Sequence, residues 1–403
     1  MANVSSSNGL EKRPKLRFPG FDEPYRKCQI GDIYAERSQR GAGNMELLSV
    51  TMNDGVMPRS EIEGKDNSSE DKSNYKVVCK GDMVYNSMRM WQGANGVSDY
   101  DGIVSPAYTV LMPTEEIDNQ YFAALFKTSN LINEFRKNSQ GLTSDTWNLK
   151  YPQIRAIRLY IPSLQEQHKI SSFIITLEER IEKQRQLVDV LKKYKRGLIS
   201  DILKQNLAVS HESEKWEEVS LNDVADGFEY GMNAAATTFD GAHKYIRITD
   251  IDDDSHTYID CDPVSPSGVL EEKYRVRDND ILFARTGASV GKSYLYRKTD
   301  GDLFFAGFLI RIHVKDGIDS EYVFLNTLTE EYAKWVLLES ARSGQPGINA
   351  EQYRRYRFKL PSLRIQKRIA SIAQKLDSQI QRESMCLHLL QEQKLGLLQQ
   401  LFI

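Results

Sequence analysis

A stripe of apolar residues with heptad spacing runs from residue 164 to residue 205. Its positions advance alternately by four and three residues, and no Pro or Gly interrupts it before Gly197. This spacing places one face of a helix against a partner helix, and the helix would be about 60 Å long. Two of its positions are polar, Gln184 and Lys195. The residues expected in the seam between the helices are Ile170, Ile174, Leu177, Ile181, Gln184, Val188 and Leu191.

The chain contains a second copy of this stripe 199 positions later. Both polar breaks recur, as Glu383 and Lys394. The residues that lead into the helices also repeat, with Ile-Pro-Ser-Leu at 161–164 and Leu-Pro-Ser-Leu at 360–363. The shared offset favours an internal duplication, in which the second helix is the partner of the first. Its expected seam residues are Ile369, Leu376, Ile380, Glu383, Leu387 and Leu390.

Each long helix follows a segment with the pattern of a mixed, mostly β domain. Short runs rich in β-branched and aromatic residues lie between Gly, Asn and Asp clusters, and landmarks such as 81–85 recur at 279–283. We therefore expect an α+β protein with a pseudo-twofold internal repeat. Its expected order is a mobile tail at 1–20, a first domain at 21–162, a helix at 163–206, a second domain at 207–361 and a helix at 362–403.

Composition narrows the class of protein. The chain has 53 Lys and Arg against 56 Asp and Glu, so no overall charge indicates a nucleic-acid partner. Its four cysteines are scattered without CxxC spacing, which favours a reducing compartment and argues against zinc. The six histidines are isolated, so we expect no metal site. A signal peptide and a long apolar run are both missing from the sequence, and this predicts a cytoplasmic protein.

The segment 286–293 resembles a phosphate-binding P-loop but has only three residues between its glycines, where a P-loop has four. The residues that follow it have a β pattern, so no helix N-terminus is available for a phosphate. A glycine-rich turn between strands that exposes Arg285, Thr286, Ser289 and Lys292 to a partner is the better interpretation. The acidic run at 250–254 lacks the Gly and Glu of a calcium loop and is expected to be a solvated loop. We find no catalytic constellation.

The remaining candidate chemistry is binding chemistry. The two domains differ most in their loops, which indicates two binding surfaces with different ligands; neutral drift after an old duplication is the alternative. Arg, Gln and Asn side chains discriminate base edges in DNA, although any one polar loop is more often plain surface. Candidates in the first domain are Arg37, Gln39, Arg40, Arg89, Trp91, Gln92, Asn95, Ser144, Trp147 and Asn148. Candidates in the second domain are Arg247, Thr249, Arg285, Thr286, Ser289, Lys292, Arg342 and Gln345.

These features resemble the specificity (S) subunit of Type I restriction–modification systems over nearly the whole chain. The most specific signals are the motif Pro-x-Leu-x-x-Gln-x-x-Ile at 162–170 and 361–369 and the long helix after each copy. In the first domain, 88–94, 102–108 and 141–149 look like a recurring target-recognition pattern. The second domain matches that pattern less well, which suggests another recognition subtype.

The resemblance implies two target recognition domains, each recognising half of a split double-stranded DNA sequence, and two long helices paired antiparallel as a spacer. Two modification (methyltransferase) subunits would dock on this scaffold, and restriction subunits would join them. S-adenosylmethionine, ATP and Mg would bind the partner subunits, so this chain would be non-catalytic and hold no cofactor. Three alternatives stay open: a coiled-coil protein-binding scaffold, a specificity subunit that works with methyltransferase alone, and a nucleotide-dependent enzyme.

Overall fold

The computed structural model describes residues 2–3, 13–41, 44–52, 55–64, 66, 68–143, 146–209, 214–341 and 345–403. The chain divides into two compact units. Unit 1 comprises Met1–Arg185 with Met385–Ile403, and unit 2 comprises Gln186–Ser384. Each unit therefore contains one globular domain together with one end of each long helix.

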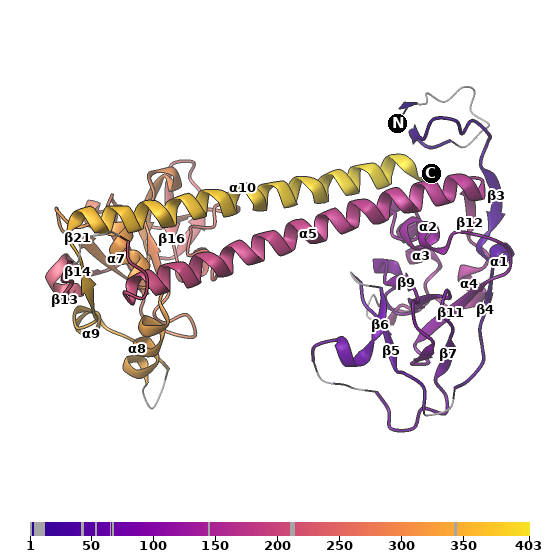
Figure 1. The fold of residues 1–403 in the computed structure, drawn as a ribbon, viewed down its shortest axis with the longest axis horizontal. Coiled ribbons are helices and arrows are strands. Elements are labelled where there is room, and N and C mark those ends of the chain that lie inside the picture. Colours follow the sequence, from indigo (N-terminus) through magenta and orange to yellow (C-terminus); the bar gives the residue numbers. More distant parts are fainter. Residues whose placement is uncertain are drawn as a thin grey trace. The chain divides into compact units, whose positions relative to one another are not determined.

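Unit 1 is built around a four-stranded antiparallel sheet of order β4-β11-β8-β9, with the additional pairs β1–β2, β3–β12, β5–β6 and β7–β10 (Figure 1). Its strands are β1 (Ala2–Asn3), β2 (Leu16–Arg17), β3 (Arg26–Gln29), β4 (Tyr34–Glu36), β5 (Leu48–Val50), β6 (Val56–Pro58), β7 (Lys76–Val78), β8 (Met83–Asn86), β9 (Asn95–Val97), β10 (Gly102–Val104), β11 (Tyr108–Pro113) and β12 (Arg158–Ile161). Its short helices are α1 (Ile30–Ile33), α2 (Asn119–Leu125), α3 (Ser129–Asn138), α4 (Tyr151–Ile154), η1 (Arg59–Glu61) and η2 (Met90–Gln92).

Unit 2 has a corresponding antiparallel sheet of order β14-β21-β18-β19, the antiparallel pairs β13–β22 and β15–β17, and the parallel pair β16–β20. Its strands are β13 (Glu217–Ser220), β14 (Ala225–Tyr230), β15 (Ala236–Thr238), β16 (His243–Ile246), β17 (Val264–Pro266), β18 (Asp280–Ala284), β19 (Ser293–Leu295), β20 (Asp302–Phe305), β21 (Leu309–Val314) and β22 (Arg357–Leu360). Its short helices are α6 (Leu221–Val224), α7 (Ser320–Asn326), α8 (Glu330–Ser340), α9 (Ala350–Arg354), η4 (Ile248–Asp250), η5 (Glu272–Tyr274) and η6 (Lys298–Asp300).

The two domains share details that only a common scaffold explains. Gly81 and Asn279, at equivalent positions, both have a positive φ, of 92° and 67°, before the strands β8 and β18. Asp118 and Asp319 both cap the N-terminus of the following helix with their side chains. The predicted α+β class and internal repeat are confirmed.

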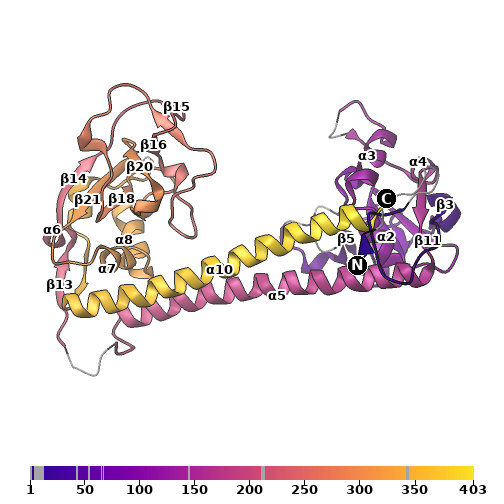
Figure 2. The same ribbon diagram turned by 90° about the horizontal axis from the view of Figure 1, so that it is seen from above.

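The long helices α5 (Leu164–Leu203) and α10 (Leu363–Leu401) lie side by side within each unit (Figures 1 and 2). In unit 1 the start of α5 and the end of α10 join the domain core, where Ile170 and Leu401 are almost fully buried. In unit 2 the end of α5 and the start of α10 do the same, through Ile202 and Ile369. The pairing is therefore antiparallel in each unit, and every predicted seam position is buried or half-buried.

The lysines that interrupt the two stripes form ion pairs across the seam. In unit 1 Lys394 lies 2.6 Å from a carboxylate oxygen of Glu178, and in unit 2 Lys195 pairs with Asp377. Both partners of the second pair are related to those of the first by 199 positions, so the two units use one register. Charged pairs of this kind select register more than they add stability. Gln184, the other break of the first stripe, is half-buried near the middle of α5.

The glutamine of each lead-in motif ties its long helix to the domain. Gln167 is buried, and its Nε2 donates to the carbonyl of Pro162 while its Oε1 accepts from the backbone N–H of Asp118, both at 3.1 Å. In unit 2 Gln366 makes the same two bonds to the equivalent Pro and Asp, at 2.8 and 2.9 Å. A buried amide with both ends satisfied fixes a local geometry. The motif therefore sets how each long helix leaves its domain.

One buried ion pair distinguishes the two units. Arg17 donates to both carboxylate oxygens of Glu166, at 2.9 and 2.8 Å, and both side chains are almost fully buried. The equivalent of Glu166 in unit 2 is Ile365, which lies in the apolar core. Arg17 belongs to the segment for which we expected a mobile tail; the structure instead anchors it at the start of α5. Residues 4–12 of that segment lie outside the described residues.

Candidate nucleic-acid interface

Two predicted binding residues of unit 1 meet in an aromatic cluster. Trp91 lies in η2, and the ring of Trp147 meets it edge-on, with 5.2 Å between the ring centroids and 78° between the planes. Arg136, in the last turn of α3, places its guanidinium 5.2 Å from the centroid of the Trp147 ring. We call these three residues the tryptophan cluster. Their chemistry suits stacking on bases and hydrogen bonding to base edges.

Local backbone geometry positions the tryptophan cluster. The helix η2 ends at Gly93, whose φ of 85° is a left-handed value that glycine adopts without strain. The Nε1–H of Trp91 donates to the carbonyl of Met88 at 2.9 Å. The backbone N–H groups of Gln140 and Asn148 each donate to the other's carbonyl, which fixes the segment that carries Trp147. The Oδ1 of Asn148 is buried and has no partner among the described residues, so a ligand could still bond to it.

Three other predicted residues lie just after β4. The Arg37 guanidinium makes hydrogen bonds of 2.6 and 3.0 Å to Asp82, and these bonds raise the pKa of Arg37. Arg40 is exposed and donates to the carbonyl of Asn74 at 2.6 Å, and Gln39 is also exposed. Arg37 is thus engaged in stabilising the domain, whereas Gln39 and Arg40 are both exposed.

The remaining predicted DNA-binding residues of unit 1 differ in their exposure to solvent. Arg89 is exposed and Gln92 is half-buried. Asn95 is fully buried in β9, where its Nδ2 donates to a backbone carbonyl at 3.0 Å. Asn95 is therefore not at the surface position that we expected, because folding buries its side chain completely. Ser144 lies outside the described residues.

In unit 2 the glycine-rich segment 286–293 is a turn between β18 and β19, as the sequence predicts. Its Gly287 N–H donates to the carbonyl of Pro346 at 3.1 Å, which joins the turn to the segment carrying the exposed Gln345. Thr286 and Ser289 are half-buried in this turn. The prediction that the Lys292 side chain is exposed to a partner is wrong.

The Lys292 side chain is only 10% exposed because it points into unit 2. Its Nζ donates to the carbonyl of Ile251 at 2.9 Å and pairs with Asp253. The ammonium therefore holds the acidic loop against the turn. Nothing in the sequence distinguishes an inward lysine from an outward one at this position.

A groove of about 580 Å³ in unit 2 collects three other predicted residues. Arg247, Thr249 and Arg285 line it together with Tyr230 and Phe308. The guanidinium of Arg285 lies 4.7 Å from the centroid of the Tyr230 ring, and the Phe308 side chain is 64% exposed. We call this the arginine groove. Like the tryptophan cluster, it combines guanidinium groups with aromatic faces.

Charge within the arginine groove is partly compensated. Arg247 makes two hydrogen bonds of 2.8 Å to Asp250, and these raise the pKa of Arg247. Arg285 has a weaker restraint, a 3.4 Å bond from Nη1 to the carbonyl of Gly307. Arg285 is therefore the more available of the two for an external partner. Arg342 lies outside the described residues.

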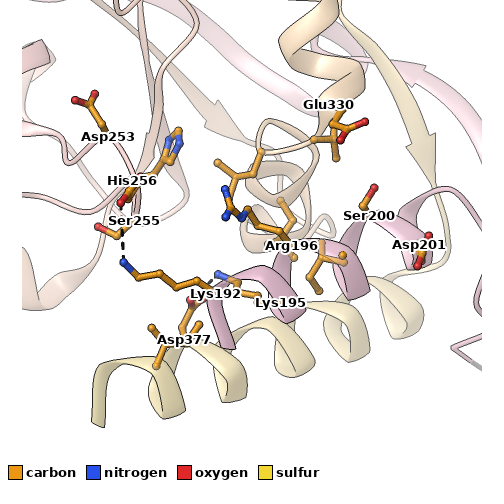
Figure 3. Close-up of a pocket in the computed structure, with 17 residues that line it drawn as sticks. Lys192, Lys195, Arg196, Ser200, Asp201, Asp253, Ser255, His256, Glu330 and Asp377 are labelled. Carbon is orange, nitrogen blue, oxygen red and sulfur yellow. Dashed lines mark hydrogen bonds and ion pairs between the residues drawn. The ribbon is translucent and has the colours of Figure 1, made fainter. Parts of the chain in front are cut away.

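A second groove of unit 2, of about 460 Å³, is lined by α5, α10, the loop 253–256 and residues of α7 and α8 (Figure 3). Lys192 approaches Asp254 to 4.0 Å across it, and burial lowers the pKa of His256, which also lines it. The acidic run at 250–254 is thus used in ion pairs with Arg and Lys side chains. This groove contains none of the predicted DNA-contacting residues.

Within the described ranges, no group of three or more His, Cys, Asp or Glu side chains is placed to hold a metal ion. Over the same ranges, we find no helix with the length and apolar character needed to cross a membrane. The tryptophan cluster and the arginine groove instead offer hydrogen bonding, positive charge and ring stacking.

A family model for the Type I restriction modification DNA specificity domain matches the chain twice, over 28–193 and 213–385. Together the matches cover well over half of the chain. The chain belongs to this specificity family. Each match contains one globular domain and a large part of the long helix that follows it, so the duplicated unit of the family is domain plus helix.

Individual relatives agree with this assignment. The specificity subunit of the Type I restriction enzyme HindI from Haemophilus influenzae is 25% identical over 183 residues, which are 43% of this chain and only 39% of that protein. A solved structure from work on complex assembly and conformational transition of the type I R-M system has a TM-score of 0.60 at 16% identity, covering 95% of this chain and 98% of that one. The S subunit of a Type I system from M. genitalium has a TM-score of 0.58 at 14% identity, covering 97% and 99%. These two structures share the specificity-subunit fold.

Three residues at these surfaces were not predicted from the sequence. Arg136 follows a common pattern, a basic residue in the last turn of a helix, and only the fold brings it onto Trp147. Tyr230 is the last residue of β14, and Phe308 lies in the turn before β21. The tripeptide Ala306-Gly307-Phe308 is one of the few parts of the recurring recognition pattern that the second domain keeps, and it is the sequence signal for Phe308.

Proposed function

We propose that this chain is the DNA-specificity subunit of a Type I restriction–modification complex, in which each unit recognises one half of a bipartite double-stranded target. The observation that supports this best is one scaffold with two unlike surfaces. The domains share their sheet order, yet unit 1 carries the tryptophan cluster and unit 2 the arginine groove. Like scaffolds with unlike surfaces suit a target whose two halves differ in sequence.

The paired long helices act as the spacer in this proposal. Two half-sites approached from one face of DNA are separated by about one turn, roughly 34–36 Å. A helix of 40 residues such as α5 extends about 60 Å, which is sufficient for that separation. The ion pairs of Lys195 and Lys394 would keep the helix register, and hence the spacer, constant.

In this proposal the long helices dock two modification subunits, and apolar side chains are exposed on them in each unit, Val190 and Tyr194 in unit 2 and Leu389 in unit 1. Restriction subunits would complete the complex in the cytoplasm. In this division of labour S-adenosylmethionine, ATP and Mg bind the partner subunits, and this chain is a non-catalytic recognition subunit.

The proposal is tested by selecting DNA from a random library with this chain assembled with its modification subunits. The expected product is a split motif with a fixed spacer. Arg285→Ala should weaken base discrimination in one half only, because Arg285 belongs to one unit. Lys273→Ala, which removes an exposed positive charge of unit 2 outside the arginine groove, is the matched control. Selection of no sequence, or an equal effect of both variants on all bases, would contradict the proposal.

The chief alternative is a coiled-coil scaffold that binds proteins and has no DNA specificity, and it predicts that the selection fails. A system with methyltransferase alone differs only in lacking a restriction subunit, so nuclease assays of the native complex separate the two. The exposed lining of the arginine groove favours DNA over the scaffold, because a scaffold needs no guanidinium groups at the loop surface of each domain.

A further inference from the structure

Equivalent positions of the two units carry side chains of opposite chemistry. The helices α3 and α8 begin after the N-caps Thr128 and Thr329, which differ by 201 positions, as do the N-caps of the preceding helices α2 and α7. With this offset Arg136 on α3 corresponds to Leu337 on α8. The scaffold therefore places an arginine and a leucine at the same point of the two domains.

Arg136 is exposed, and its guanidinium is held only by stacking on Trp147. No hydrogen bond or ion pair joins it to any residue that the structure describes. Arg26 and Arg37 of the same unit are, by contrast, paired with carboxylates. Arg136 thus keeps its five donors available in a planar fork, and the ring restricts where that fork points. A pre-oriented guanidinium loses less freedom when it binds.

Leu337 is 72% exposed and its neighbour Leu338 is 77% exposed. The helix that carries them is well packed on its other face, where Tyr332 is buried and stacks on Trp335. The two leucines are therefore directed outward by a firmly held helix. The two neighbouring leucines form a small apolar patch, which suits contact with an apolar group of a partner.

We propose that this shared position contacts a base in each half-site, with Arg136 donating to N7 and O6 of a guanine and Leu337 packing on the methyl group of a thymine. The inference rests on the proposed function and names the chemistry of one contact in each half. Guanine alone offers two adjacent acceptors in the major groove, and thymine alone offers a methyl group. A bidentate arginine contact changes the preference for the correct base by roughly ten- to a hundredfold.

The test maps the methylated motif of the complex with its modification subunits for the wild type, Arg136→Leu and Leu337→Arg. The wild-type motif should contain a guanine in the half assigned to unit 1. Arg136→Leu should reduce discrimination at that one base by about ten- to a hundredfold and leave the other half unchanged. Leu337→Arg should shift one position of the other half towards guanine. Arg136→Lys, which keeps the charge and loses the fork, should also relax the guanine.

The matched control is Lys137→Ala, which removes a neighbouring charge that pairs with Glu134 on the same helix; it should leave the motif unchanged. The inference is overturned if Arg136→Leu and Arg136→Lys retain the wild-type motif. It is also overturned if Arg136→Leu lowers methylation equally at every base, because that indicates a phosphate contact or a structural role. A wild-type complex that methylates no bipartite motif would instead overturn the proposed function itself.

Discussion

Breaking the buried ion pair between Arg17 and Glu166 is expected to destabilise unit 1 strongly, whereas replacing both partners is expected to cost little. The two side chains are 4% and 0% exposed, and two hydrogen bonds of 2.8 and 2.9 Å join them. Removing one partner leaves a buried charge uncompensated, which costs about 3–5 kcal/mol. Replacing both with apolar residues removes the charges together and is often neutral. The Nη1 of Arg17 is already buried without a partner, which adds to the cost of keeping the pair.

Unit 2 supplies the design of the variants, because Ile365 stands where unit 1 has Glu166. We would compare Glu166→Ile, Arg17→Met and the double variant. Native-state hydrogen exchange measured by mass spectrometry reports each unit separately. Protection in the core of unit 1 should fall by on the order of a hundredfold or more in each single variant and recover largely in the double variant. Unit 2 is the internal control. Single variants within about 1 kcal/mol of the wild type, or a double variant as unstable as the singles, would refute the reasoning.

Three further predictions concern the long helices and the acidic loop. Deleting one heptad from both long helices at matched positions should shorten the spacer of the methylated motif by about three base pairs, since seven residues correspond to about 10 Å; an unchanged spacer would refute the spacer role. Replacing Gln184 and Glu383 with Leu should raise the melting temperature but permit cysteine cross-links in shifted registers, because apolar seam positions specify register less well; unchanged cross-linking would count against this. His256 has a lowered pKa because of burial, so stability should fall as pH drops below about 6.5, where the unfolded state gains the proton. His256→Asn, which tolerates the φ of 56°, should lessen that fall between pH 8 and pH 5.5 in urea titrations, and an identical slope would contradict it.

The architecture was largely predictable because it rests on local patterns. Heptad spacing is visible in any helix-length window, and the copy at a fixed offset identified the partner helix. The Lys195 and Lys394 breaks were visible as well, but their carboxylate partners were not. Those partners, Asp377 and Glu178, occupy polar, solvent-exposed positions of the opposite helix, outside its apolar stripe. Their selection depends on the register between the two helices.

The binding surfaces were less predictable because they depend on long-range placement and side-chain direction. The turn at 286–293 was predicted, yet the inward direction of Lys292 follows from the loop that packs on it. Asn95 was expected at the surface, but the sheet buries it. Arg136 has no distinctive sequence pattern. Its importance comes from its contact with the ring of Trp147, which lies in a separate segment after α3.

The most direct test of the account is to replace residues 21–160 with the same segment of a relative of different specificity and to map the methylated DNA motif of the assembled complex. Because each unit is proposed to recognise its own half-site, one half of the motif should change to that of the relative. The other half and the spacer should stay as in the wild type. A change in both halves, or in neither, would contradict the claim that each unit recognises one half of the target.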